Sequence, residues 1–140
     1  RMGIGFGMKV IASDIHQNHF LSEVLGFQYM DFEDVLKKSD IISLHITADK
    51  ENEGWMENTK FRVMKDGVVF LKSSRPWLVD EEAFKWALEN KLAGAWVDFE
   101  LSFSHPKLIT TPHLGGTTLE SRAKSELIIA KKLKKLYGSI

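Results

Sequence analysis

Short apolar runs alternate with segments of helical periodicity along the whole chain. Six runs predict strands, at residues 8–14, 27–30, 41–46, 68–74, 93–98 and 108–111. Several of these runs are apolar throughout and do not alternate with polar residues, which is typical of strands buried on both faces. The pattern therefore predicts an α/β fold, in which a doubly wound parallel sheet carries helices on both faces.

Helix starts stand between the predicted strands. Asp31 precedes one helical pattern, and Asp80 precedes another whose first turn holds Glu81 and Glu82. Acidic groups favour a helix start because they accept hydrogen bonds from its free N–H groups and complement its dipole. A last helix is predicted from about residue 117, and the lysines near its end are interpreted as a solvated helix terminus. Its apolar residues, at mixed three- and four-residue spacing, are Leu119, Ala123, Leu127, Ala130 and Leu133.

Composition limits the kinds of partner. Hydrophobic residues make up 44% and charged residues 27% of the 140 residues, as in an ordinary globular domain, and we interpret residues 1–140 as one domain. Lys and Arg together number 19, as do Asp and Glu, so no net charge attracts nucleic acid or an anionic membrane. Cysteine is absent, and no apolar run nears the roughly 20 residues of a membrane span. We therefore expect a cytoplasmic protein with no metal site.

Polar side chains close five of the predicted strands. They are Asp14, His45, Arg75, Asp98 and His113. In doubly wound sheets, ligands bind outside the carboxyl ends of the strands, where such residues meet. The five positions therefore predict one shared crevice.

Three of these residues have a chemical and a structural interpretation. Asp14 suits the two hydroxyls of an adenosine ribose, and it equally suits a turn or a helix cap. Arg75 offers a planar fork of donors for a carboxylate, or it pairs at the surface with Asp80 or Glu81. His113, between a proline and a glycine pair, is a candidate proton carrier or a structural histidine.

Taken together, the segments resemble the D-isomer-specific 2-hydroxyacid dehydrogenase family. The similarity runs from about Phe6 to Tyr137 with the order and spacing of the segments preserved. It is carried by residues 6–12, 43–45, 64–70, 73–75, 78–83, 92–95 and 111–116. The resemblance implies a Rossmann-like dinucleotide-binding domain that uses NAD.

The resemblance also implies residue roles. Arg75 would bind the carboxylate and carbonyl of a small 2-hydroxy or 2-keto acid, and His113 would be the general acid and base of hydride transfer. Asp14 would hold the adenine ribose and disfavour NADP. The other cofactor contacts would be His45, Ile46 and Thr47 along the adenosine side, Asp98 at the nicotinamide carboxamide, and Ser74 and Gly115 beside the nicotinamide ring.

The N-terminal segment departs from the family pattern. A first strand and a Gly-x-Gly-x-x-Gly turn should precede Phe6, where five residues stand. We expect this strand, the glycine turn and the family's substrate domain to be absent from the chain. The glycines at positions 3, 5 and 7 are interpreted as the end of a helix, because a strand follows them.

Two further departures support an alternative, a non-catalytic scaffold that binds a nucleotide or a protein. The family's glutamate after Asp98 would pair with the histidine, whereas Glu100 stands out of register. Pro76 stands where the family commonly has glycine, and should restrict Arg75 to an extended backbone. Members usually pair through this domain, so a homodimer face is expected from the last helix with Trp55, Trp77 and Trp86.

Overall fold

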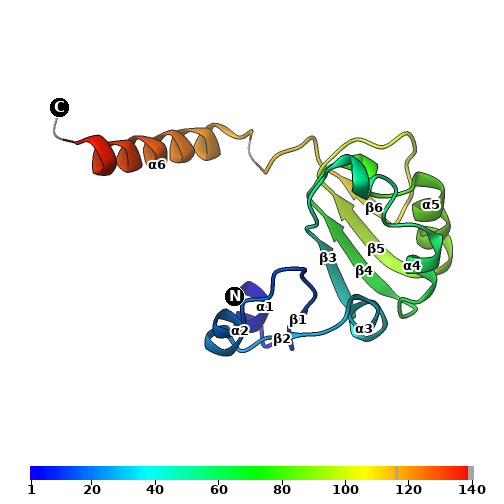
Figure 1. The fold of residues 1–140 in the computed structure, drawn as a ribbon. Coiled ribbons are helices and arrows are strands. Elements are labelled where there is room, and N and C mark those ends of the chain that lie inside the picture. The colour runs from blue at the N-terminus through cyan, green and yellow to red at the C-terminus, as the bar shows by residue number, and fades with distance from the viewer. Residues whose placement is uncertain (116, 139–140) are drawn as a thin grey trace.

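The computed structural model describes residues 1–115 and 117–138, and strands and helices alternate along it (Figure 1). The strands are β1 (Ile11–Ala12), β2 (Gln28–Tyr29), β3 (Ile41–Leu44), β4 (Val68–Lys72), β5 (Leu92–Val97) and β6 (Leu108–Thr110). The helices are α1 (Met2–Gly5), α2 (His19–Leu25), α3 (Phe32–Lys38), α4 (Asn58–Arg62), α5 (Glu81–Asn90) and α6 (Leu119–Tyr137). Two 3₁₀ turns cover Lys50–Asn52 and Pro76–Leu78.

All six predicted strands are confirmed, five of them with narrower bounds and β5 shifted by one residue, and every pairing between them is parallel. They form two sheets: β1 pairs with β2, and the other four strands lie in the order β3-β4-β5-β6. The predicted strand at 8–14 is the most shortened, because its ladder covers only the two residues opposite Gln28 and Tyr29. The α/β class predicted from the sequence is confirmed, and the four-stranded sheet carries the core.

Strand β4 places alternate side chains in that core. Val68, Phe70 and Lys72 are buried, while Val69 and Leu71 between them are half-buried. Phe70 packs edge-on against Phe61 of α4, with ring centroids 5.5 Å apart. Side chains along a strand alternate between its two faces, so Lys72 lies on the same face as Val68 and Phe70. The core face of β4 therefore ends in Lys72.

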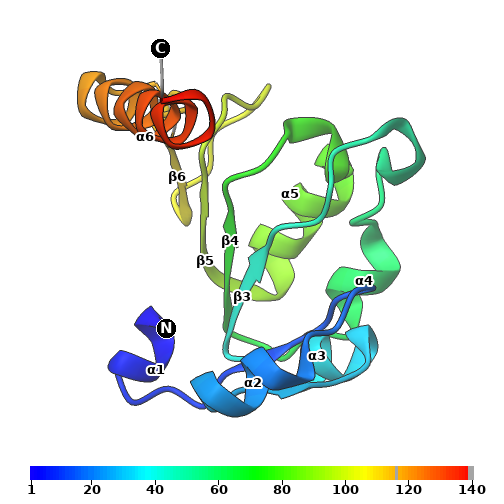
Figure 2. The ribbon, with the colours of Figure 1, turned by 60° about the vertical axis from the view of Figure 1, so that its left-hand side comes forward.

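Helices α3, α4 and α5 lie on one side of the four-stranded sheet (Figure 2). Side chains of all three belong to the buried core, among them Leu36, Phe61 and Phe84. Residues on the opposite side of the edge strands are open to solvent, with Ile41 46% and Ile109 64% exposed. Burial therefore alternates along β3 and β4, although their apolar sequences predicted burial on both faces.

The N-terminal glycines end a helix, as predicted. The amide of Gly7 donates to the Ile4 carbonyl at 2.9 Å, and that of Met8 donates to the Gly3 carbonyl at 2.9 Å. Gly7 has a φ of 76°, the left-handed conformation that this helix ending requires. The chain then continues into the strand region that leads to β1.

The predicted cap at Asp80 is confirmed, and α6 has a cap at Thr118 that was not predicted. The Asp80 carboxylate accepts from the amide of Ala83 at 2.7 Å, and the Thr118 hydroxyl accepts from the amide of Ser121 at 3.2 Å. Asp31 occupies the N-cap position of α3, but its side chain accepts no cap hydrogen bond.

Helix α6 stands apart from the sheet (Figure 1). Among the described helices, none is long and apolar enough to cross a membrane.

Candidate active site

The carboxyl ends of β4, β5 and β6 bring together residues far apart in the sequence. Nη1 of Arg75, after β4, lies 3.2 Å from Nε2 of His113, after β6. The other ring nitrogen of His113, Nδ1, lies 3.3 Å from the carbonyl oxygen of Asp98, after β5. Since a guanidinium only donates, Nε2 accepts and Nδ1 carries the proton that reaches the carbonyl. The predicted convergence of these three strand ends is therefore observed.

The backbone at His113 is held in an uncommon conformation. Its φ is 55°, and it is the one non-glycine residue with a positive φ in the described part of the chain. The Thr117 hydroxyl donates to the His113 carbonyl at 2.5 Å, and the His113 amide donates to the Thr111 carbonyl at 2.9 Å. Such a conformation persists only where the surroundings enforce it, and it turns the imidazole toward Arg75.

The carboxylate of Asp98 provides that enforcement. Although it closes a strand, it is only 2% exposed. Its Oδ1 accepts from the Thr111 hydroxyl at 2.6 Å and from the Leu114 amide at 2.7 Å, and its Oδ2 accepts from the Gly115 amide at 3.0 Å. The Thr111 hydroxyl, and then the two amides, hold the pKa of Asp98 below its usual value against the opposing effect of burial. Asp98 thus stays ionised and fixes the loop that carries His113.

Arg75 has an extended backbone, with a φ of −79° and a ψ of 144°, as Pro76 was predicted to require. Its guanidinium forms no ion pair with Asp80 or Glu81 within the described residues, where its side-chain partner is His113. The surface ion-pair interpretation is therefore wrong. Arg75 instead presents its donors at the edge where the strands converge.

Lys72 is a residue of this site that sequence reasoning missed. It is fully buried, and its ammonium donates to the carbonyl of Arg75 and, at 3.2 Å, to that of Pro76. The ammonium also lies 4.3 Å from the centre of the Phe99 ring. Burial lowers the pKa of Lys72 from 10.5 to about 8, so the side chain is still charged at neutral pH. The available signal was the two-residue period of β4, which places Lys72 on the same face as Val68 and Phe70.

The residues predicted for the adenosine side lie on other strand ends. The exposed Asp14 carboxylate accepts from the His16 amide at 2.8 Å, which is an Asx turn. His45 follows β3 with its Nε2 2.7 Å from the Ser43 hydroxyl, and the Thr47 carbonyl accepts from the Asn52 side chain at 2.9 Å. Ile46 packs against the core. No hydrogen bond within the described residues links this group to Arg75 or His113.

Two further side chains bear on the site. The Ser74 hydroxyl, next to Arg75, is buried and has no hydrogen-bond partner within the described chain. Buried hydroxyls are normally paired, so this oxygen lacks the partner that its burial calls for. Glu100 is exposed, and no hydrogen bond joins it to His113 in the part of the chain that the structure describes. The Asp98 carbonyl supports the imidazole instead.

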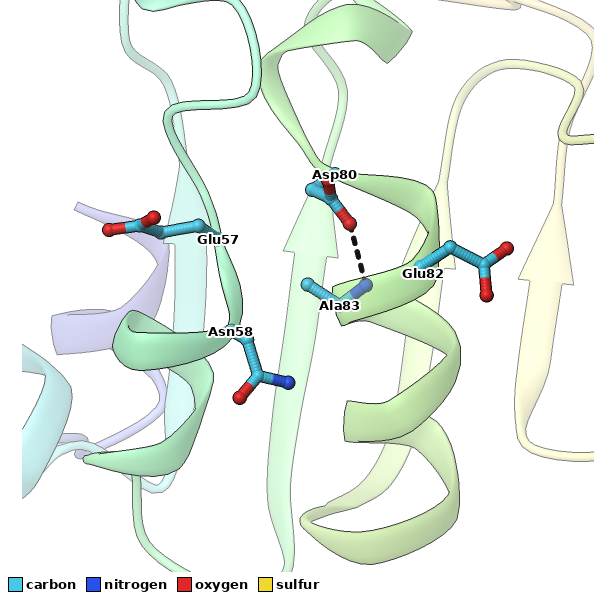
Figure 3. A pocket seen from close by; sticks show the side chains of 5 residues that line it. All are labelled: Glu57, Asn58, Asp80, Glu82 and Ala83. Atoms are coloured by element: carbon cyan, nitrogen blue, oxygen red, sulfur yellow. Dashed lines mark hydrogen bonds between the residues drawn. The ribbon is translucent and has the colours of Figure 1, made fainter.

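Two hollows in the described surface are lined by other residues than those of this cluster. One of about 360 Å³ lies between the first turns of α4 and α5 and is lined by Glu57, Asn58, Asp80, Glu82 and Ala83 (Figure 3). Its Asp80 is occupied as a helix cap, and none of the predicted site residues lines it. A second hollow, of about 580 Å³, is lined by Ala48, Asp49, Lys50, Glu53 and Trp77. Of its lining residues, Ala48 directly follows Thr47, and Trp77 lies two residues after Arg75.

Comparisons with known proteins agree with this geometry. Glyoxylate reductase of Thermococcus litoralis is 34% identical over an alignment of 138 positions, which covers 92% of this chain and 42% of that protein. D-3-phosphoglycerate dehydrogenase of Archaeoglobus fulgidus is 32% identical, over 90% of this chain and 26% of that protein. The chain thus spans less than half the length of these relatives.

Solved structures show the same fold. D-lactate dehydrogenase from Aquifex aeolicus, complexed with NAD and lactic acid, superimposes with a TM-score of 0.77 at 28% identity, over 94% of this chain and 47% of that one. The apo D-lactate dehydrogenase from Escherichia coli gives a TM-score of 0.79 at 26% identity, over 96% and 45%. The family model for the D-isomer specific 2-hydroxyacid dehydrogenase NAD-binding domain matches residues 1–115. The chain therefore belongs to the D-isomer specific 2-hydroxyacid dehydrogenase family, and residues 1–115 match its NAD-binding domain.

Proposed function

We propose that the full-length protein is an oxidoreductase that interconverts a small 2-hydroxy acid and the corresponding 2-keto acid with NAD. The observation that carries this proposal is the 3.2 Å contact between the Arg75 guanidinium and Nε2 of His113. A fixed cation beside a titratable ring nitrogen suits a substrate that has a carboxylate next to a carbonyl. The family membership supports the same reaction class.

Each residue then has a separate task. The Arg75 guanidinium binds the carboxylate and polarises the adjacent carbonyl. The ring described above carries its proton on Nδ1, so His113 first takes up a second proton at Nε2. It donates that proton to the carbonyl oxygen during reduction and regains one there during oxidation. The Asp98 carbonyl accepts from Nδ1 throughout, so it fixes the orientation of the ring. NAD, when bound, supplies or accepts the hydride.

The residues present fit such a cofactor. The unpartnered Ser74 hydroxyl and the neighbouring Gly115 lie beside the Arg75–His113 pair and would contact the nicotinamide. Asp98 would contact its carboxamide. Asp14, His45, Ile46 and Thr47 lie at the carboxyl ends of other parallel strands, where the adenosine half would bind.

The test is an assay of the full-length protein with NADH and glyoxylate, pyruvate or hydroxypyruvate. Oxidation of NADH that depends on one of these acids supports the proposal. NADH binding without turnover of any 2-keto acid would contradict it and favour the non-catalytic scaffold, which the displaced Glu100 also suggests. Product analysis would identify the 2-hydroxy acid formed.

Asp14 separates two interpretations of the N-terminal strand end. If its carboxylate holds the adenosine ribose, Asp14→Ala should raise the Kd for NADH about tenfold. The same change should reduce the protein's preference for NADH over NADPH. If Asp14 only closes the Asx turn with His16, both Kd values should stay within twofold of the wild type. Titration of both cofactors by fluorescence decides, with Asp40→Ala as the control, because Asp40 is a highly exposed carboxylate paired with Lys65.

We infer that the protein is a cytoplasmic homodimer in which residues 1–140 form one dinucleotide-binding domain beside a separate substrate domain. The length of the relatives supports the second domain, and the absence of cysteine suits a reducing compartment. Trp55 and Trp86 pack against the domain's own core, so the dimer face is assigned to α6 and to Trp77, which is 45% exposed. On α6, Leu127 is 54% and Leu133 is 51% exposed.

Sedimentation velocity tests this face. The wild type should sediment as a dimer, and Leu127→Glu combined with Leu133→Glu should give a monomer, because charges would replace apolar contact. Ile109→Glu is the control, since Ile109 is an apolar residue with 64% exposure that belongs to β6 and not to α6. A wild type that sediments only as a monomer would rule out the dimer.

A further inference from the structure

Lys72 has a position that is unusual for a lysine. It follows Val68 and Phe70 on the core face of β4, and it is fully buried. Among the described residues its ammonium takes part in no ion pair with a carboxylate. A buried charge without a counter-ion is costly, so its hydrogen bonds must satisfy it.

Both of those hydrogen bonds end on one turn. The ammonium donates to the carbonyls of Arg75 and Pro76, and it lies against the face of the Phe99 ring. Phe99 directly follows Asp98, whose amide donates to the Lys72 carbonyl at 3.0 Å. Lys72 therefore connects the turn that carries Arg75 to the strand end that holds the His113 loop.

We propose that Lys72 is a positioning residue that fixes the backbone of Arg75, so that its guanidinium faces Nε2 of His113. Pro76 restricts Arg75 from one side by limiting its backbone to the extended region. Lys72 holds it from the other side through the carbonyl groups. The role rests on the proposed function, in which Arg75 binds the substrate carboxylate.

The chain offers a matched control. Nζ of Lys107 donates to the carbonyls of Leu88 and Leu92 at 2.9 and 3.0 Å, so it makes the same kind of contact where α5 turns into β5. Lys72→Met and Lys107→Met each remove an ammonium from two backbone carbonyls. Only the first of these contacts lies on the Arg75 turn.

Steady-state kinetics of the full-length protein provide the first test. Lys72→Met should raise the KM for the 2-keto acid at least about tenfold, because a misplaced guanidinium binds the carboxylate poorly, while the Kd for NADH stays within twofold. Lys72→Gln, whose side-chain amide keeps two N–H donors, should recover part of the loss. Lys107→Met should leave both constants within twofold. An unchanged KM in Lys72→Met, or equal effects of the two Met variants, would overturn the proposal.

The second test does not need turnover, so it separates this proposal from the proposed function. The ¹⁵N chemical shifts of the His113 ring report the contact with Arg75. They should move in Lys72→Met as they do in Arg75→Lys, and stay unchanged in Lys107→Met. If the wild type reduces no 2-keto acid, the proposed function fails, while these shifts still decide whether Lys72 positions Arg75. Ring shifts that do not respond to Lys72→Met or to Lys72→Gln would contradict the positioning role.

Discussion

Replacing His113 with asparagine in the full-length protein should lower kcat for 2-keto acid reduction by about 10²- to 10⁴-fold, the usual contribution of a general acid. Asparagine tolerates the left-handed backbone that His113 adopts, with its φ of 55°, so the loop should keep its shape. The KM for the acid should change little, because Arg75 remains. Stopped-flow measurement of NADH oxidation under single-turnover conditions would give the rate of the chemical step directly.

The control for this variant is His19→Gln. His19 lies on α2, where its ring meets Tyr29 edge-on, and no hydrogen bond among the described residues joins its side chain to the candidate active site. Its replacement should leave kcat within twofold. A His113→Asn protein that retains more than about a tenth of the wild-type rate would remove His113 from the mechanism and leave the proton to another donor.

Replacing Asp98 with asparagine should damage the same site through its support. An amide offers one acceptor oxygen where the carboxylate takes three hydrogen bonds, from Thr111, Leu114 and Gly115. The His113 loop should then lose its fixed geometry, and kcat should fall at least about tenfold. The melting temperature should fall by about 5 °C, since hydrogen bonds to a charged acceptor are lost. Calorimetry and kinetics on the same preparation would show both effects.

The pH dependence gives this prediction a direction. The pKa of Asp98 in the folded protein is below its usual 3.8, so its hydrogen bonds stabilise the ionised form. The stability difference between the wild type and Asp98→Asn should be constant above about pH 4, and should shrink as the pH falls through the lowered pKa. The control, Asp40→Asn, concerns a carboxylate that is 87% exposed and should show little difference at any pH. A difference that grows toward acid would contradict the assigned role of Asp98.

The strands could be predicted because each is a short apolar run bounded by polar residues. The cap at Asp80 could be predicted because its side chain acts locally. Long-range effects could not be predicted in this way. The division into two sheets depends on which strands form hydrogen bonds with one another, and such pairs lie far apart in the sequence. The one-sided burial of β4 is hidden in its sequence, because Val69 and Leu71 are apolar although they lie outside the core.

The site was predictable to a similar extent. The strand-end rule selected Arg75, Asp98 and His113, and the family resemblance gave them roles, so their meeting was expected. The carboxylate of Asp98 had been interpreted only as a cofactor contact, whereas it also fixes the His113 loop. Lys72 was missed because lysines are almost always exposed. Its burial becomes evident only when it is known which face of β4 packs against the core.

The two sheets differ in a way that affects how a ligand would be held. None of residues 1–30 is buried, whereas β3 to β6 enclose the whole core with their helices. Amide hydrogens of β1 and β2 should therefore exchange with solvent through local opening, long before those of β4 and β5, which require global unfolding. Asp14 lies in the part that opens easily, and Arg75 and His113 are anchored to the part that does not. A dinucleotide that spans both would have to order its adenosine half of the site, so part of its binding energy would be used to fold the N-terminal strands onto the ligand.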